Sequence, residues 1–315
     1  MDALDIRIVR ELTQGQSVTP ARPGILASHR QLARVLGVSG GTVRNRVKEM
    51  TGTGFLQGMV SYVNPSALGL EAVAYTIEVG AGVSKPTVIE RISRLDGVIF
   101  FENFRGSLLG IGVLYEDDAG RKRTLERIDR IARSTPVLYS RVRFPPCSDA
   151  LTALDWGTVR GLMAGNLRGH AALARELKVS VRTVKRRVAR LIEIGAIFTF
   201  PRMDYRKVSG GVTAELLVTF RDPSTKSEVV PRILRLLEEH LTFVGSWEEF
   251  DMYRVILPNV PVLDLLAKEV GKLSGVRSVR GELVDEVLDR FDSLRPYLER
   301  HLATPGTGGT ATLAA

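Results

Sequence analysis

Apolar residues recur at helical spacing near the start of the chain and again near its middle. In both places an apolar helix face is followed by a short second helix, a serine, and a third helix with inward apolar residues. Ser39 and Ser180 are predicted to cap the third helices, and Gly54 and Gly195 to end them. Two helices joined by a tight turn predict a helix-turn-helix unit in each half.

The two halves are copies of one another. Residues 31–54, QLARVLGVSGGTVRNRVKEMTGTG, align without a gap with residues 172–195, ALARELKVSVRTVKRRVARLIEIG, at a constant offset of 141. The first copy carries extra residues within QSVTPARPGILAS, residues 16–28, whose prolines and glycine predict an exposed loop. The chain therefore contains an internal duplication.

Strands and helices alternate after each helix-turn-helix unit. Their order is βαββαβ in both copies, which predicts an antiparallel sheet with both helices on one face. The fold class is thus α+β, with two tandem copies of a winged-type helix-turn-helix followed by a ferredoxin-like domain. The predicted helix-turn-helix domains span residues 1–60 and 149–205, and the predicted ferredoxin-like sensing and dimerisation domains span 61–148 and 206–302. Residues 303–315 have no apolar periodicity and are predicted to be a disordered tail.

The net charge of +9 is distributed unevenly along the chain. Residues 1–60 contain eight Lys and Arg against four Asp and Glu, and residues 150–208 contain twelve against four. The remaining segments together carry a small negative charge. Because both basic segments coincide with helix-turn-helix units, they predict two contacts with double-stranded DNA.

The outward positions of the two third helices hold the candidate DNA-binding residues. A recognition helix needs donors that reach base edges and cations that contact phosphates. Gly40 and Gly41 provide no side chain at the start of the first of these helices, so the second copy is expected to bind DNA more tightly. The candidates are Arg182, Thr183, Lys185, Arg186, Arg187 and Arg190 in the second copy, and Thr42, Arg44, Asn45, Arg46 and Lys48 in the first.

The sequence offers little for catalysis or for a metal. Cys147 is the only cysteine, and the four histidines are scattered without metal-ligand spacing. Nucleophile-elbow, phosphate-loop and zinc-protease motifs are absent, so no enzyme activity, cofactor or metal is expected. No apolar run approaches the roughly 18 residues that span a bilayer, and the amino terminus does not look like a signal peptide. A soluble, cytoplasmic protein is expected.

The string LARxLxVSxxTVxxRV, followed by a strand and a βαββαβ domain, resembles the leucine-responsive regulatory protein/AsnC family of transcriptional regulators. The resemblance covers nearly the whole chain, twice. It implies DNA binding by the first domain, and effector sensing and oligomerisation by the second. One polypeptide would then hold both halves of a dimer, which could associate further. The effector, a small metabolite such as an amino acid, would lie near turn residues Gly245, Trp247 and Asp251, with Gly106 in the first copy, which lacks the acid.

Two alternatives stay open at the level of sequence. Sirohaem decarboxylases resemble the same family and use a histidine just after the helix-turn-helix. The corresponding segments here, FLQGMVSYV and AIFTFPRMDY, contain none. A metabolite-sensing module that binds another protein is the second alternative. The basic recognition faces favour DNA, since protein-binding faces expose aromatic and apolar anchors.

Overall fold

Both predicted helix-turn-helix units are present in the computed structural model, which describes residues 1–13, 29–147, 149–163 and 169–303. The first unit consists of α1 (Ala3–Thr13), α2 (His29–Leu36) and α3 (Gly40–Gly52). The second consists of α6 (Ala153–Met163), α7 (His170–Glu176) and α8 (Val181–Glu193). The predicted loop at 16–28 and the predicted tail beyond residue 303 lie outside the described residues.

The predicted ends of the recognition helices are confirmed. Ser39 Oγ accepts a hydrogen bond from the Thr42 amide, and Ser180 Oγ accepts one from the Thr183 amide, each at 3.0 Å. Gly54 and Gly195 follow these helices with φ of 78° and 69°, a backbone region that favours glycine. Local sequence alone therefore sets where α3 and α8 begin and end.

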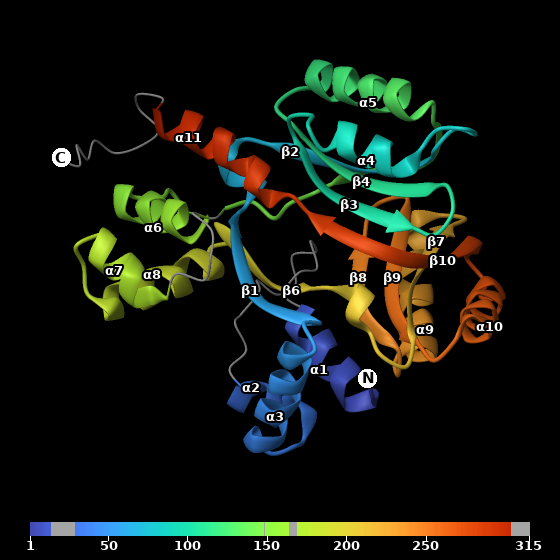
Figure 1. The fold of residues 1–315 in the computed structure, drawn as a ribbon, viewed down its shortest axis with the longest axis horizontal. Helices are drawn as coiled ribbons and strands as arrows, with labels where there is room; N and C mark the ends of the chain where they lie inside the picture. Colours follow the sequence, from blue (N-terminus) through green and yellow to red (C-terminus); the bar gives the residue numbers. More distant parts are fainter. Residues whose placement is uncertain (14–28, 148, 164–168, 304–315) are drawn as a thin grey trace.

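Each α+β domain has the predicted βαββαβ order (Figure 1). In each copy all strand pairs are antiparallel, and both helices cover one face of the sheet, as Val88 and Ile128 do over Val73. The first domain comprises β2 (Glu71–Glu78), α4 (Lys85–Ile92), β3 (Val98–Phe104), β4 (Leu108–Tyr115), α5 (Asp118–Ala132) and β5 (Thr135–Val142). The second comprises β7 (Val212–Phe220), α9 (Lys226–Leu237), β8 (Leu241–Ser246), β9 (Phe250–Leu257), α10 (Val260–Gly271) and β10 (Val276–Asp289).

Strand β10 joins the two sheets and extends past VRSVRGELV, the segment with which it begins. Its first part pairs with β7, and the part from Val284 to Asp289 pairs with β3. The eight strands therefore follow the order β5-β2-β4-β3-β10-β7-β9-β8. The sheet faces that carry no helices pack on one another through Phe104, Leu217 and Met252. Pairing with β3 explains why β10 continues as a strand after the part that pairs with β7.

The helix-turn-helix units are exchanged between the copies. Strands β1 (Leu56–Val63) and β6 (Ile197–Met203) follow the two units and pair with each other antiparallel. Helix α1 packs on β8 of the second domain, where the Thr13 hydroxyl donates to the Thr242 carbonyl oxygen. The second unit shares a core with Leu70 and Leu114 of the first domain. Each unit thus lies against the α+β domain of the other copy (Figure 1).

A helix that the sequence analysis did not identify follows β10. Helix α11 (Arg295–Ala303) buries Leu298 in the core of the second helix-turn-helix unit. The His301 ring lies 4.7 Å from the ring of Trp156 on α6. Helix α11 therefore supports the second unit, and among the described residues no corresponding helix packs on the first. None of the described helices is long and apolar enough to cross a membrane.

Candidate nucleic-acid interface and internal cavity

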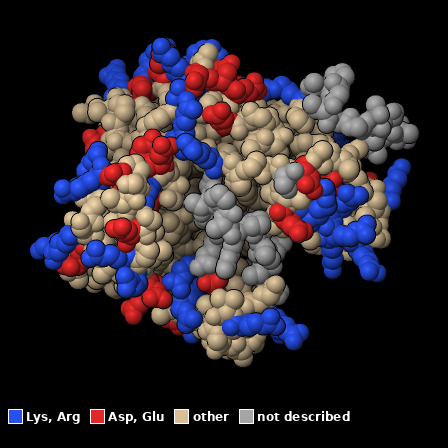
Figure 2. Space-filling model, turned by 180° about the vertical axis from the view of Figure 1, so that it is seen from behind, with Lys and Arg blue, Asp and Glu red and all other residues tan. Residues whose placement is uncertain are grey.

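The start of α8 presents the strongest basic surface of the two recognition helices. Arg182, Lys185 and Arg186 are exposed, and none of them forms an ion pair with another described residue. Lys and Arg side chains gather on the protruding part of the surface that holds this unit, on the right of Figure 2. Free cations on the first two turns of a capped helix match what a major-groove reader needs.

Arg187 and Arg190 have a different environment from their neighbours on α8. Both guanidinium groups bind the fully buried carboxylate of Asp155 on α6, at 3.0 and 3.2 Å, and Arg190 also binds Asp149. Burial alone would raise the pKa of Asp155, but hydrogen bonds from Thr152 and the charge of Arg187 outweigh it and lower the pKa below 3.8. These contacts favour a role for Arg187 and Arg190 in holding α8 against α6.

The first unit repeats this arrangement with fewer free cations. Arg46, the counterpart of Arg187, binds Asp2 at 2.7 Å and Asp5 at 3.5 Å. Arg44, Asn45 and Lys48 are exposed on α3. Thr42 and Thr183 are half-buried, and each hydroxyl lies within 2.9 Å of its capping serine. The sequence analysis did not distinguish the arginines that bind an acid within the unit from those that stay unpaired. The aspartates in the first helix of each unit, Asp5 and Asp155, could have indicated this difference.

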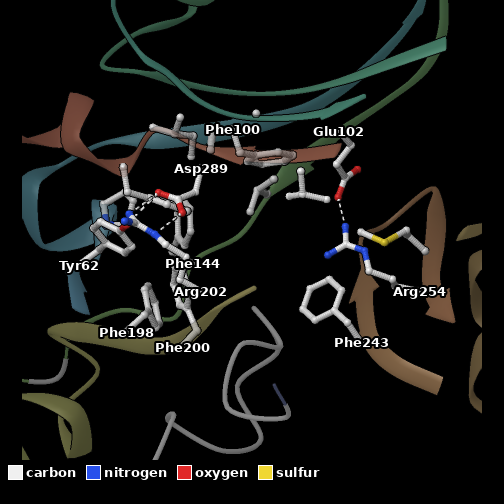
Figure 3. Close-up of a pocket in the computed structure, with 18 of the residues that line it drawn as sticks. Tyr62, Phe100, Glu102, Phe144, Phe198, Phe200, Arg202, Phe243, Arg254 and Asp289 are labelled. Atoms are coloured by element: carbon white, nitrogen blue, oxygen red, sulfur yellow. Dashed lines mark hydrogen bonds and ion pairs between the residues drawn. The ribbon is translucent and has the colours of Figure 1, made fainter. Parts of the chain in front are cut away.

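A cavity of about 200 Å³ lies between the sheets and the β1–β6 ribbon (Figure 3). Strands β5 and β8 are the two edge strands of the described eight-stranded sheet. Val142 at the end of β5 and Phe243 on β8 both line the cavity. Aromatic side chains form a large part of its wall, including Tyr62, Phe100, Phe144, Phe198, Phe200 and Trp247.

An ionic cluster borders the cavity on the side of β9. Arg254 binds Glu102 of the first copy at 2.6 Å and Glu215 of the second at 2.5 Å. Two carboxylates thus share one guanidinium group, and all three side chains are almost fully buried. Burial, followed by repulsion from Glu215, raises the pKa of Glu102 to about 8. The cluster holds one more acid than base unless Glu102 keeps its proton.

The four predicted effector residues do not form one site. Trp247 lines the cavity, and its ring covers Gly245, where a Cβ would meet that ring at 2.5 Å. Asp251 is buried and fully occupied, since Lys226, Ser246 and Tyr253 donate to it at 2.9, 2.6 and 2.8 Å. Gly106 lies in the exposed β3–β4 turn, where its carbonyl oxygen accepts a hydrogen bond from a lysine. Of the four, only Trp247 borders the cavity.

The residues that line the cavity differ from those expected of a histidine-dependent or metal-dependent site. None of the four histidines lines the cavity, and β1 and β6 instead contribute Tyr62, Phe198 and Phe200. Among the described residues, no group of three or more His, Cys, Asp or Glu could hold a metal ion. The cavity residues suit ligand binding by aromatic contact and charge.

Two capped helix-turn-helix units on a joined pair of ferredoxin-like domains define the class of this protein. Residues 1–51 match the model of the AsnC-type helix-turn-helix domain. A curated relative, the HTH-type transcriptional regulator Ptr1 of Methanocaldococcus jannaschii, is 37% identical over 95 residues, which are 30% of this chain and 56% of the relative. The chain thus spans about half the length of that relative. The chain is thus similar to the Lrp/AsnC regulators at its amino-terminal domain, and its two-domain unit occurs twice.

The chain also has limited similarity to solved structures. The siroheme decarboxylase NirDL, in complex with an iron-uroporphyrin III analogue, is 13% identical with a TM-score of 0.47, and the alignment covers 94% of this chain and 98% of that one. The leucine response regulatory protein LrpA of Mycobacterium tuberculosis is 22% identical with a TM-score of 0.35, over 45% of this chain and 97% of that one.

Proposed function

We propose that this chain is a sequence-specific, DNA-binding transcriptional regulator that reads a duplex with two unequal recognition helices. The observation that carries the proposal is the pair of serine-capped helices with free cations, three of them on α8. The AsnC-type match over residues 1–51 and the regulator among its relatives support the same function.

The joined α+β domains would act as the frame of an intramolecular pseudo-dimer. The β1–β6 ribbon and the strand β10 connect the copies, so one chain presents two reading helices. A small metabolite bound to these domains would change the relative positions of the recognition helices α3 and α8. Further copies of the chain could associate through the same domains. We propose a binding protein and not an enzyme, because β1 and β6 contribute aromatic side chains and no histidine to the cavity wall.

Binding to a library of genomic DNA fragments at two salt concentrations tests the proposal. Enrichment of a motif with two unequal half-sites, weakened by salt, is expected because phosphate contacts dominate affinity. Removing two phosphate contacts with Lys185→Ala/Arg186→Ala should weaken binding to every fragment and lower the salt slope by about 2.

The matched control is Lys122→Ala/Arg123→Ala on α5, which removes the same charge from two exposed positions outside the helix-turn-helix units. It should leave both affinity and salt slope near those of the unaltered protein. An equal loss in both variants would mean that net charge, and not the face of α8, governs binding. Absence of DNA binding at either salt concentration would overturn the proposed function.

A further inference from the structure

The aromatic cavity has the size of a single-ring molecule. Its volume of about 200 Å³ exceeds the roughly 150 Å³ at which a protein cavity accepts benzene. The rings of Phe100, Phe198 and Phe243 surround the space from three different strands (Figure 3). Aromatic faces carry negative electrostatic potential and attract cations placed over them. The wall therefore suits an apolar ring linked to a positive charge.

The charges that border the cavity give the same preference. Arg202 is engaged with Asp289 through two hydrogen bonds, so this pair is neutral. On the opposite side, Arg254 already binds both Glu102 and Glu215. When Glu102 is ionised, three carboxylates thus stand against two guanidinium groups. An incoming anion would have to displace one of these acids, whereas an incoming cation would supply the missing positive charge.

Glu102 is the group positioned to receive that charge. Its Oε1 accepts a hydrogen bond from Arg254 at 2.6 Å, while Oε2 accepts none from the described residues and lies over Gly110. The side chain lines the cavity and is 13% exposed. Trp247 lines the same cavity, and its indole N–H is buried without a hydrogen-bond partner among the described residues.

We propose that this cavity is a binding site for a small organic amine, with its ammonium group on Glu102 and its single ring among the aromatic side chains. The site is separate from the recognition helices, and its occupation does not require DNA. It also differs from a site at the Gly245 and Asp251 turn, because Asp251 is already fully occupied within the protein.

Calorimetric titration of the full chain with three probes of one shape tests the proposal. The probes are phenethylamine, phenethyl alcohol and hydrocinnamate, which carry a positive, a neutral and a negative group on the same ring. At about pH 8 the amine should bind at least about tenfold more tightly than either of the others. Equal affinity, tighter binding of the anion, or no binding of any probe at millimolar concentration would overturn the assignment.

Three variants connect the binding to the cavity. Glu102→Gln keeps the shape but removes the charge, so it should abolish the preference for the amine. Val142→Trp places a ring in the cavity and should abolish binding of the amine altogether. Glu90→Gln, at an exposed position on α4, is the matched control and should bind like the unaltered protein. An amine preference that persists in Glu102→Gln, or amine binding that persists in Val142→Trp, would refute the site.

Discussion

Charge is placed asymmetrically between the two copies at the level of single residues. The sheet register sets Glu215 opposite Arg254 in the second copy and Ala74 opposite Gly112 in the first. A Cβ at Gly112 would meet the Phe100 ring at 2.1 Å. In the first copy the Phe100 ring therefore fills the space that the Arg254 side chain occupies in the second copy. The positive charge then reaches across to Glu102 of the first copy. One ionic cluster therefore ties the copies together and borders the cavity.

The raised pKa of Glu102 makes the stability of the fold depend on pH. Its folded-state pKa of about 8 lies above the ordinary value of 4.5, so between these values the folded protein holds a proton that the unfolded chain has released. Arg254, Glu215 and Tyr205 are the ionisable groups that face it. The free energy of unfolding should fall with rising pH in this window, by up to about 1.4 kcal/mol per pH unit.

Urea denaturation across this pH window measures the effect. Glu102→Gln cannot titrate, so its free energy of unfolding should fall less steeply than that of the unaltered protein. Glu90→Gln should follow the unaltered protein. Parallel slopes for Glu102→Gln and the unaltered protein would show that Glu102 ionises normally in the folded state.

At the scale of elements, helix α8 carries two kinds of arginine, those that bind α6 and those that stay exposed. Asp155 receives Arg187 and Arg190, while Arg182 and Arg186 stay exposed. Arg46 and Asp5 form the corresponding contact in the first unit. Because the same acid and the same arginine recur in both copies, the contact belongs to the helix-turn-helix fold itself.

Asp155→Asn should loosen the second unit without removing a DNA contact. Loss of the carboxylate leaves two guanidinium groups without their buried acceptor, and because these groups are partly exposed we expect a cost on the order of 2 kcal/mol. Hydrogen exchange of the α6 and α8 amides should accelerate, while the salt slope of DNA binding should not change. Since the pKa of Asp155 is lowered, its stabilisation is present at neutral pH and is lost as pH falls through that value. A reduced salt slope with unchanged exchange would instead assign Arg187 and Arg190 to DNA.

Local patterns predicted much of the fold and little of the cavity. Periodicity and the offset between the copies predicted the helix-turn-helix units, the caps Ser39 and Ser180, and the βαββαβ order. Glu102, Arg254 and Asp289 are far apart in the sequence and border one cavity in a sheet where β3 pairs with β10, a pairing that no short-range pattern encodes. The same pairing explains why β10 extends past the segment VRSVRGELV. Helix α11 was missed because its apolar residues are few.

For the whole molecule, duplication within one chain allows the two halves to specialise. A symmetric dimer must carry the same recognition helix twice, whereas this chain carries a helix with three free cations and a helix that opens with Gly40 and Gly41. The cavity is asymmetric as well, since Arg254 has no basic counterpart in the first copy. Both the DNA face and the cavity therefore depend on the difference between the copies as much as on their similarity.

Restoring the cation missing from the first recognition helix tests this specialisation directly. Gly41 aligns with Arg182, and a Cβ at Gly41 would meet only Ser39 Oγ at an ordinary 3.6 Å, so Gly41→Arg fits without rearrangement. It should tighten DNA binding and raise the salt slope by about 1, through one added phosphate contact. Gly41→Ala controls for the gain in helix propensity and should leave the slope unchanged. If Gly41→Arg bound DNA no better than Gly41→Ala, α3 would not reach the duplex, and α8 would be the only reading helix of this chain.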